Sequence, residues 1–260
     1  MKYLVQCVFV GLSIWLVGCH SVPKTGRTSL NLVSEKKLAA IAAQEFEQMK
    51  RRTPVSSNYD YNERVQRVGQ RIVAVASKDL PNAQWEFVVF EDDQINAFAM
   101  PGGKVAVYTG LLKLAENDDE LAIVIGHEIA HVTARHSNER ISQSQLKSGF
   151  LTIGSLALQL GTGLGGLERD AILIATGAGA DIGLMLPFSR SHESEADQIG
   201  LLYAAEAGYN PYAAISFWEK MEAAKEGKSP TWLSTHPSGE TRMRRLWGYI
   251  PEATEVYKEK

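Results

Sequence analysis

Hydrophobic residues recur every three or four positions over most of this chain, and that spacing predicts amphipathic helices. We expect helices over residues 34–52, 60–77, 118 onward, 191–207, 210–225 and 240–249. Ser34 is a suitable cap for the first of these, and Asn117 or Asp118 for the third. Gly208 is typical of the residue that follows a helix, and Pro251 is expected to end the last one.

Three shorter stretches are rich in β-branched and aromatic residues and predict strands instead. They cover residues 85–90, 96–100 and 104–108, and a Pro-Gly-Gly turn joins the last two. A short helix near Leu111 is expected to lead from them to the helix that begins near Asp118. The pattern therefore predicts an α+β fold, mainly helical, with a small and mostly antiparallel sheet beside that helix.

Residues 149–187 stand apart because they hold two apolar runs that are rich in Gly and Ala. Glu168-Arg169-Asp170 separates the two runs, and Asp181 interrupts the second. Two interpretations stay open. The segment is either a buried helical hairpin or flap over an active site, or a surface that faces a membrane or a substrate.

Composition narrows the class of protein. The chain has 260 residues, of which 45% are hydrophobic and 22% charged, enough for one large core or two small ones. The net charge is −3 and there is no run of Lys or Arg, so we expect no nucleic-acid partner. One catalytic domain is expected, and the sequence leaves its oligomeric state unknown.

The N-terminus has the features of a processing signal. Lys2 precedes an apolar stretch at residues 3–17 that is short for a membrane span, and Leu16-Val17-Gly18-Cys19 resembles the bacterial lipobox. We expect a signal peptide at residues 1–18, a lipid on Cys19, and a polar tether up to residue 33. An uncleaved membrane anchor and an ordinary signal peptide are the alternatives. His20 follows the cysteine, which by resemblance to the sorting rule of enteric-type bacteria favours the outer membrane.

The sequence His127-Glu128-Ile129-Ala130-His131 carries the most specific chemistry in the chain. On a helix the two histidines lie about 40° apart around the axis, so both imidazoles can bind one metal ion. Glu128 lies about 100° from His127, close enough to hold a water molecule against that ion and take its proton. Two neutral nitrogen ligands and a carboxylate base are what a zinc hydrolase requires. The alternative is a surface helix with two incidental histidines.

A catalytic zinc ion needs a third protein ligand, and an acidic cluster on the 191–207 helix offers one. Glu193 and Asp197 are four residues apart and share a helix face, whereas Glu195 points roughly the opposite way. We expect Glu193 to bind the metal and Asp197 to accept a hydrogen bond from the far nitrogen of a ligating histidine. A solvated acidic face, or Glu195 as the ligand, are the alternatives. His136 and His192 have unsuitable spacing, and we interpret them as structural.

These motifs together resemble the M48 (Ste24/HtpX-like) zinc metallopeptidases. The resemblance rests on residues 127–131, 189–197 and 96–103, and on Ser234-Thr-His236-Pro with Arg242. It implies a zincin-like metallopeptidase domain over residues 34–250, followed by a C-terminal tail at 251–260. It also implies one zinc ion per chain, held by His127, His131 and Glu193. The closest subgroup is that of periplasmic outer-membrane lipoproteins, here without a tetratricopeptide tail.

The resemblance implies an endopeptidase of the bacterial envelope that cleaves unfolded or misassembled membrane and periplasmic proteins. Glu128 is then the base that activates a zinc-bound water, and His236 and Arg242 stabilise the oxyanion or hold the substrate. His236 is also a candidate zinc ligand in a resting state. Residues Asn96, Ala97 and Phe98 are candidates for binding an extended substrate by backbone pairing. The alternatives are an outer-membrane assembly factor or chaperone with little proteolysis, and a hydrolase of a non-peptide envelope substrate.

Overall fold

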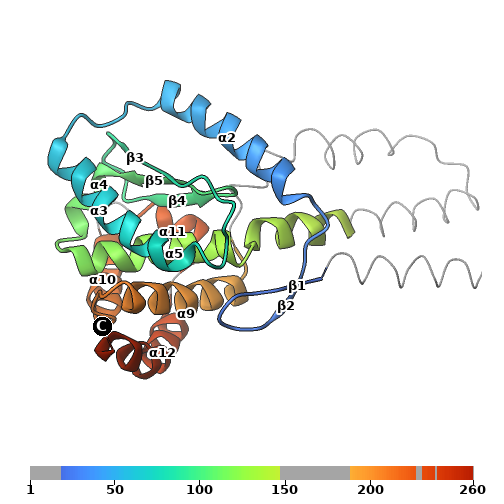
Figure 1. Cartoon of the computed structure of the whole chain (residues 1–260). Coiled ribbons are helices and arrows are strands. Elements are labelled where there is room, and N and C mark those ends of the chain that lie inside the picture. The colour runs from blue at the N-terminus through green and yellow to red at the C-terminus, as the bar shows by residue number, and fades with distance from the viewer. Residues whose placement is uncertain (1–18, 147–187, 227–229, 238, 260) are drawn as a thin grey trace, which may run out of the picture.

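The computed structural model describes residues 19–146, 188–226, 230–237 and 239–259. At its centre lies a three-stranded sheet of β3 (Glu86–Phe90), β4 (Ala97–Met100) and β5 (Lys104–Tyr108). The order is β3-β5-β4, so the central strand β5 runs parallel to β3 and antiparallel to β4. Helix α2 (Glu35–Arg52) covers one face of this sheet and α5 (Asp118–Thr133) lies against the other (Figure 1). The α+β fold with a small sheet beside the 118–133 helix is therefore confirmed.

The turn between β4 and β5 needs the glycines that the sequence supplies. Gly102 and Gly103 both have positive φ, at 85° and 94°, a region that L side chains avoid. A Cβ on Gly102 would also approach the Ala39 side chain to 2.7 Å, because α2 crosses the turn closely. The turn therefore fixes the β4–β5 register and leaves β4 at the edge of the sheet.

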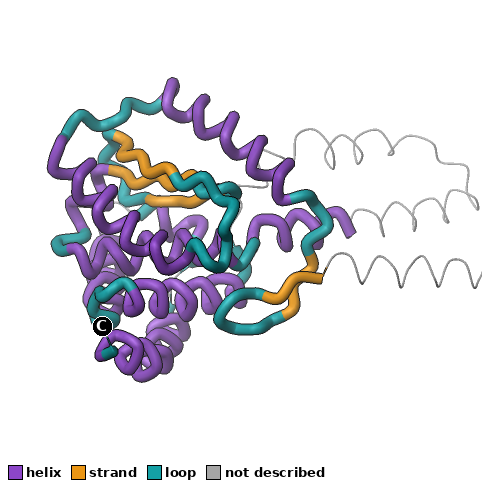
Figure 2. Tube along the Cα trace, in the orientation of Figure 1, coloured by secondary structure: helices purple, strands orange, loops and turns teal. Residues whose placement is uncertain are grey.

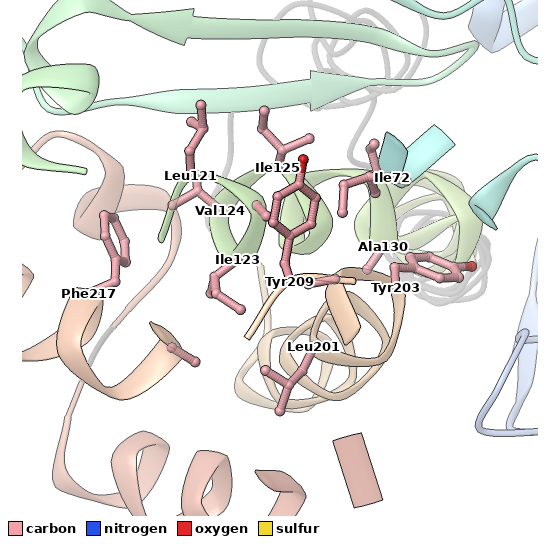
Figure 3. Close-up of a cluster of buried hydrophobic side chains, with 14 of the residues drawn as sticks. Ile72, Leu121, Ile123, Val124, Ile125, Ala130, Leu201, Tyr203, Tyr209 and Phe217 are labelled. Carbon is pink, nitrogen blue, oxygen red and sulfur yellow. The ribbon is translucent and has the colours of Figure 1, made fainter. Parts of the chain in front are cut away.

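Helix α5 is the most deeply buried element. Every residue from Glu120 to Thr133 is buried, as expected for a helix with neighbours on all sides. Figure 3 shows Leu121 and Ile125 pointing from α5 toward the sheet, while Leu201 comes from α9 beneath it. The other neighbours of α5 are α3 (Tyr59–Ala76), α9 (Arg190–Glu206) and α10 (Ala213–Ala223). Helix α12 (Glu240–Lys258) packs against α9, and α4 (Thr109–Leu114) is the short helix expected near Leu111.

Two helix ends differ from the expectation, and two short helical elements were not expected. Helix α5 ends at Thr133, and a new helical stretch begins at 136 after Arg135 adopts a left-handed φ of 57°. Helix α12 does not stop at Pro251 but continues to Lys258, because the burial of Ile250 and Ala253 offsets the cost of a proline inside a helix. Residues 251–258 therefore belong to α12 and are no separate tail. A short helix, α11 (Trp232–Thr235), lies in a region predicted as loop, and a 3₁₀ turn (Ala224–Glu226) follows α10.

The N-terminal segment is packed rather than extended. Strands β1 (Cys19–Ser21) and β2 (Thr28–Leu30) form an antiparallel hairpin, coloured orange at the right of Figure 2. Val22 in its loop is only 1% exposed and belongs to the main core. The expectation of a polar tether through residue 33 was therefore wrong, because Val22 and Arg27 dock the hairpin on the domain.

Residues 149–187, for which membrane contact was one interpretation, lie outside the described part of the chain, which breaks off after residue 146 and resumes at Phe188. Within the described ranges, every helix is too short or too polar to span a bilayer. The signal-peptide prediction at residues 1–18 likewise lies outside them.

Candidate metal centre

Helix α5 places His127, Glu128 and His131 on adjoining faces within one turn. Its start is fixed by Asn117, whose side chain accepts a hydrogen bond from the Glu120 N–H at 2.9 Å. The Nε2 atoms of His127 and His131 lie 3.0 Å apart, and both side chains are buried. The spacing of the motif therefore produces the converging pair of imidazoles that the sequence predicted.

Helix α9 brings Glu193 to this pair. The Glu193 carboxylate lies 3.6 Å from His127 Nε2 and 3.5 Å from His131 Nε2. The loop after α11 adds His236, whose Nδ1 is 3.2 Å from His127 Nε2 and 3.1 Å from Glu193 Oε1. Glu195 points away from these atoms and binds His136 and Arg27.

The four side chains fit a divalent metal ion. Each offers a ligand atom, and these atoms all lie within 4.8 Å of one another in a buried position. The two Glu193 oxygens have different neighbours, since Oε2 lies 2.8 Å from Arg242 Nη1 while Oε1 lies 3.5 Å from His131 Nε2 and 3.1 Å from His236 Nδ1. Three imidazole nitrogens and one carboxylate oxygen are a donor set that suits zinc in tetrahedral coordination.

The protonation of the histidines agrees with this role. Burial lowers the pKa of the His131 imidazole well below its usual value, and neighbouring histidines lower it further, so the ring is neutral. Burial also lowers the pKa of His236, but the carboxylates of Glu128 and Glu193 outweigh this and raise it overall. His236 therefore carries a proton more readily than His131 does.

Asp197 and Arg242 support the ligands from behind. The Asp197 Oδ1 atom lies 3.0 Å from His127 Nδ1, and Arg242 donates two hydrogen bonds of 2.7 Å to the same carboxylate. Burial raises the pKa of Asp197, but Arg242 and His127 lower it to about 2. Arg242 Nη1 also lies 2.8 Å from Glu193, and its guanidinium stacks 4.0 Å from the Trp218 ring. Arg242 thus holds Asp197 and Glu193, a role that differs from the substrate contact expected from the sequence.

Two donors hold the Glu128 carboxylate. Trp232 Nε1 donates a 2.7 Å hydrogen bond to Oε1, and the backbone N–H of Ala99 on β4 donates one of 3.2 Å to Oε2. Glu128 lies at the wall of a cavity of about 220 Å³ between β4 and the 231–236 segment. Asn96 and Phe98 line this cavity, whereas the Ala97 side chain is buried in the core and can meet a substrate only through its backbone.

Three contributors to this site were not predicted from the sequence. Trp232 donates to Glu128 across 104 positions of the chain, a separation that no local pattern reveals. Phe188 stacks on the His131 ring at 4.0 Å between centroids. His136, interpreted as structural, lies with its Nδ1 2.9 Å from His131 Nδ1. The one signal in the sequence was that His136 lies close to the motif. The direction of its ring could not be predicted, because it depends on the end of helix α5 at Thr133.

Comparisons with known proteins agree with the geometry. The sequence profile of peptidase family M48 matches residues 60–250. The mitochondrial metalloendopeptidase OMA1 of Schizosaccharomyces pombe is 37% identical over 237 residues, covering 89% of this chain and 66% of that protein. The β-barrel assembly-enhancing protease of Escherichia coli is 35% identical over 182 residues, covering 68% of this chain and 36% of that protein. The chain thus spans between about a third and two thirds of the length of these relatives.

Proposed function

Since the chain belongs to peptidase family M48, we propose that it is a zinc-dependent endopeptidase of the bacterial envelope that cleaves unfolded or misassembled membrane and periplasmic proteins. The observation that carries this proposal is the position of Glu128. Its carboxylate lies beside the metal-binding atoms and also faces the cavity, so it can reach a water molecule and a peptide at once.

The bound zinc ion would supply Lewis acidity, which polarises a peptide carbonyl and acidifies water. His127, His131 and Glu193 would hold the ion, and Asp197 fixes the His127 ring by accepting from Nδ1. Glu128 accepts the proton of the attacking water and passes it to the leaving amine. Trp232 and the Ala99 N–H keep that carboxylate in place during both transfers. His236 Nε2, 3.4 Å from Glu128 Oε1, is the group placed to stabilise a developing oxyanion or to close the site at rest.

The edge position of β4 supports a polypeptide substrate. Strand β4 pairs with β5 on one side only, and the cavity is lined by Phe98, Ala99 and Met100 of this strand and by Asn96 just before it. An extended peptide can add to such an edge through backbone hydrogen bonds, which give little sequence preference. Weak preference suits a protease that acts on unfolded chains.

The envelope location rests on the lipobox and on the names of the relatives. Cys19, the residue expected to carry the lipid, is exposed at the start of β1. The E. coli relative is named as an assembly-enhancing protease, and others are named as mitochondrial. We place this chain at the outer membrane, anchored by the Cys19 lipid and facing the periplasm. A Cys19→Ser variant should lose incorporation of a palmitate analogue and membrane retention.

The test of the activity uses purified protein, unfolded casein and a chelator. Wild type should cleave casein, the chelator should abolish cleavage, and zinc should restore it at one ion per chain. Glu128→Gln should keep the zinc and lose cleavage. Cleavage by Glu128→Gln at the wild-type rate would remove Glu128 as the base. Suppression of aggregation without any cleavage by the wild type would instead favour the assembly factor or chaperone.

A further inference from the structure

A chain of side-chain contacts runs from the candidate metal ligand His131 to the N-terminal hairpin. His131 Nδ1 lies 2.9 Å from His136 Nδ1, and His136 Nε2 lies 2.9 Å from Glu195 Oε2. Arg27, between β1 and β2, donates from Nε to both Glu195 oxygens at 3.0 and 2.9 Å. These contacts thus connect residues from four separate segments, and they end at the Nδ1 atom of His131.

The chemistry of imidazole allows only one arrangement of protons along this chain when His131 holds a metal. A metal on His131 Nε2 requires the ring proton to be on Nδ1, so His131 must donate to His136. His136 Nδ1 then accepts, and its own proton is on Nε2, where it is donated to Glu195. A carboxylate only accepts, so Glu195 determines the direction of both hydrogen bonds.

Arg27 fixes the position of the Glu195 carboxylate, which determines the direction of the two hydrogen bonds. Its guanidinium lies between Glu195 and Glu139, with donors 2.9 and 2.7 Å from the two Glu139 oxygens. Thr25 of the same hairpin loop donates a 2.6 Å hydrogen bond to Glu195. Glu195 and Glu139 are both buried. The hairpin supplies the Arg27 guanidinium, which offsets the cost of burying the two carboxylates.

We propose that His136 and Glu195 are positioning residues of the metal centre and that Arg27 makes the docked N-terminal hairpin part of it. This rests on the proposed ligand set, in which His131 binds the ion. Its consequence is that the segment directly after the lipid-anchor cysteine is coupled to the affinity of the catalytic site for its metal.

The first experiment compares His136→Leu with His136→Asn by competition between protein and chelator for zinc. The leucine variant loses the acceptor for His131, so its zinc affinity should fall about 10- to 100-fold. Asparagine can place its Oδ1 atom near the Nδ1 position and accept from His131, so it should recover most of the loss. Equal losses in the two variants would show a packing role and overturn the proposal.

The second experiment measures the tautomer of His131 and the effect of the hairpin on zinc binding. Nitrogen-15 NMR of the metal-free wild type should show His131 protonated on Nδ1, and this preference should be lost in His136→Leu. Arg27→Met should weaken zinc binding several-fold, whereas Glu139→Gln should change it less than twofold. Glu139→Gln is the matched control because Glu139 shares the Arg27 guanidinium but accepts its hydrogen bonds from Arg27, His192 and Gln143 rather than from His136.

The outcomes separate this proposal from the proposed function. A wild-type chain that binds no zinc, or that binds it equally after His131→Ala, would overturn the ligand set. Zinc binding that depends on His131 but is unchanged in Arg27→Met and His136→Leu would overturn only the coupling. If His136→Leu does not fold, the comparison of Arg27→Met with Glu139→Gln decides the question.

Discussion

Gly126 lies directly against Gly200, so that a Cβ added to Gly126 would come within 2.7 Å of the Gly200 carbonyl oxygen. Gly126 precedes His127 on α5, and Gly200 lies on α9 three residues after Asp197. The absence of both side chains lets the two helices approach until Glu193 and Asp197 meet the histidines. A glycine inside a helix normally costs about 1 kcal/mol against alanine, and this contact is the reason for it here.

Gly126→Ala should therefore destabilise the protein and weaken the metal site. The added methyl group meets backbone, which cannot rotate away, so we expect the free energy of unfolding to fall by about 1–3 kcal/mol. Separation of α5 from α9 should also lower zinc affinity. The matched control is Gly248→Ala on α12, where nothing lies within 4 Å of the added atom. That variant should gain about 0.5–1 kcal/mol, measured by denaturant unfolding. Equal effects of the two substitutions would contradict the close contact.

Trp232→Phe should reduce turnover without unfolding the site. It removes the 2.7 Å hydrogen bond to Glu128, so the carboxylate keeps the hydrogen bond from the Ala99 N–H and the neighbouring His236 ring, 3.4 Å away. A hydrogen bond to a charged group contributes about 1.5–3 kcal/mol, so we expect kcat to fall roughly 10- to 100-fold with little change in KM. Trp85→Phe is the control, because the Trp85 indole N–H has no hydrogen-bond partner among the described residues. A similar loss of kcat in both variants would argue against a specific bond to Glu128.

Asp197→Asn should weaken metal binding more than it weakens folding. The carboxylate accepts from His127 Nδ1 and so keeps Nε2 free for the metal. An amide can turn its NH₂ group to the ring, and we expect zinc affinity to fall about 10- to 100-fold. Asp118→Asn provides the comparison, since Asp118 pairs with Arg64 and Arg67 away from the metal ligands. Unchanged zinc affinity in Asp197→Asn would remove Asp197 from the support of His127.

The Glu139 carboxylate should make the free energy of unfolding depend on pH in the acid range. Burial raises the pKa of this carboxyl, but hydrogen bonds from His192 and Arg27 outweigh it and lower the pKa from 4.5 to about 2. A lowered pKa adds stability above the unfolded-state value, and this contribution disappears as pH falls through the folded-state value. Wild type should thus exceed Glu139→Gln by on the order of 1 kcal/mol above pH 4.5, because solvent partly screens the pair. Unfolding in chelator between pH 5 and pH 2 should show this difference vanish; a constant difference would contradict the pairing.

Several elements could be predicted closely from the sequence because they depend on local periodicity. Helix α2 was expected over 34–52 and spans Glu35–Arg52, and β5 was expected over 104–108 and spans Lys104–Tyr108. The exceptions have tertiary causes. The turn at Arg135 and the passage of α12 through Pro251 depend on packing, which offsets local preferences that favour the opposite outcome.

By itself the sequence determined the chemistry of the centre, since helical spacing alone aligns His127 with His131 and Glu193 with Asp197. It could not decide what surrounds these residues, because hydrogen-bond directions depend on segments that are distant along the chain. The bond between His136 and Glu195 spans 59 positions, and the one between Arg27 and Glu195 spans 168. Only the folded chain shows that Trp232 holds Glu128 and that the N-terminal hairpin is connected through Glu195 and His136 to the candidate ligand His131. A hydrogen bond needs two partners within about 3 Å, and only the packing of α5, α9 and the hairpin supplies that proximity.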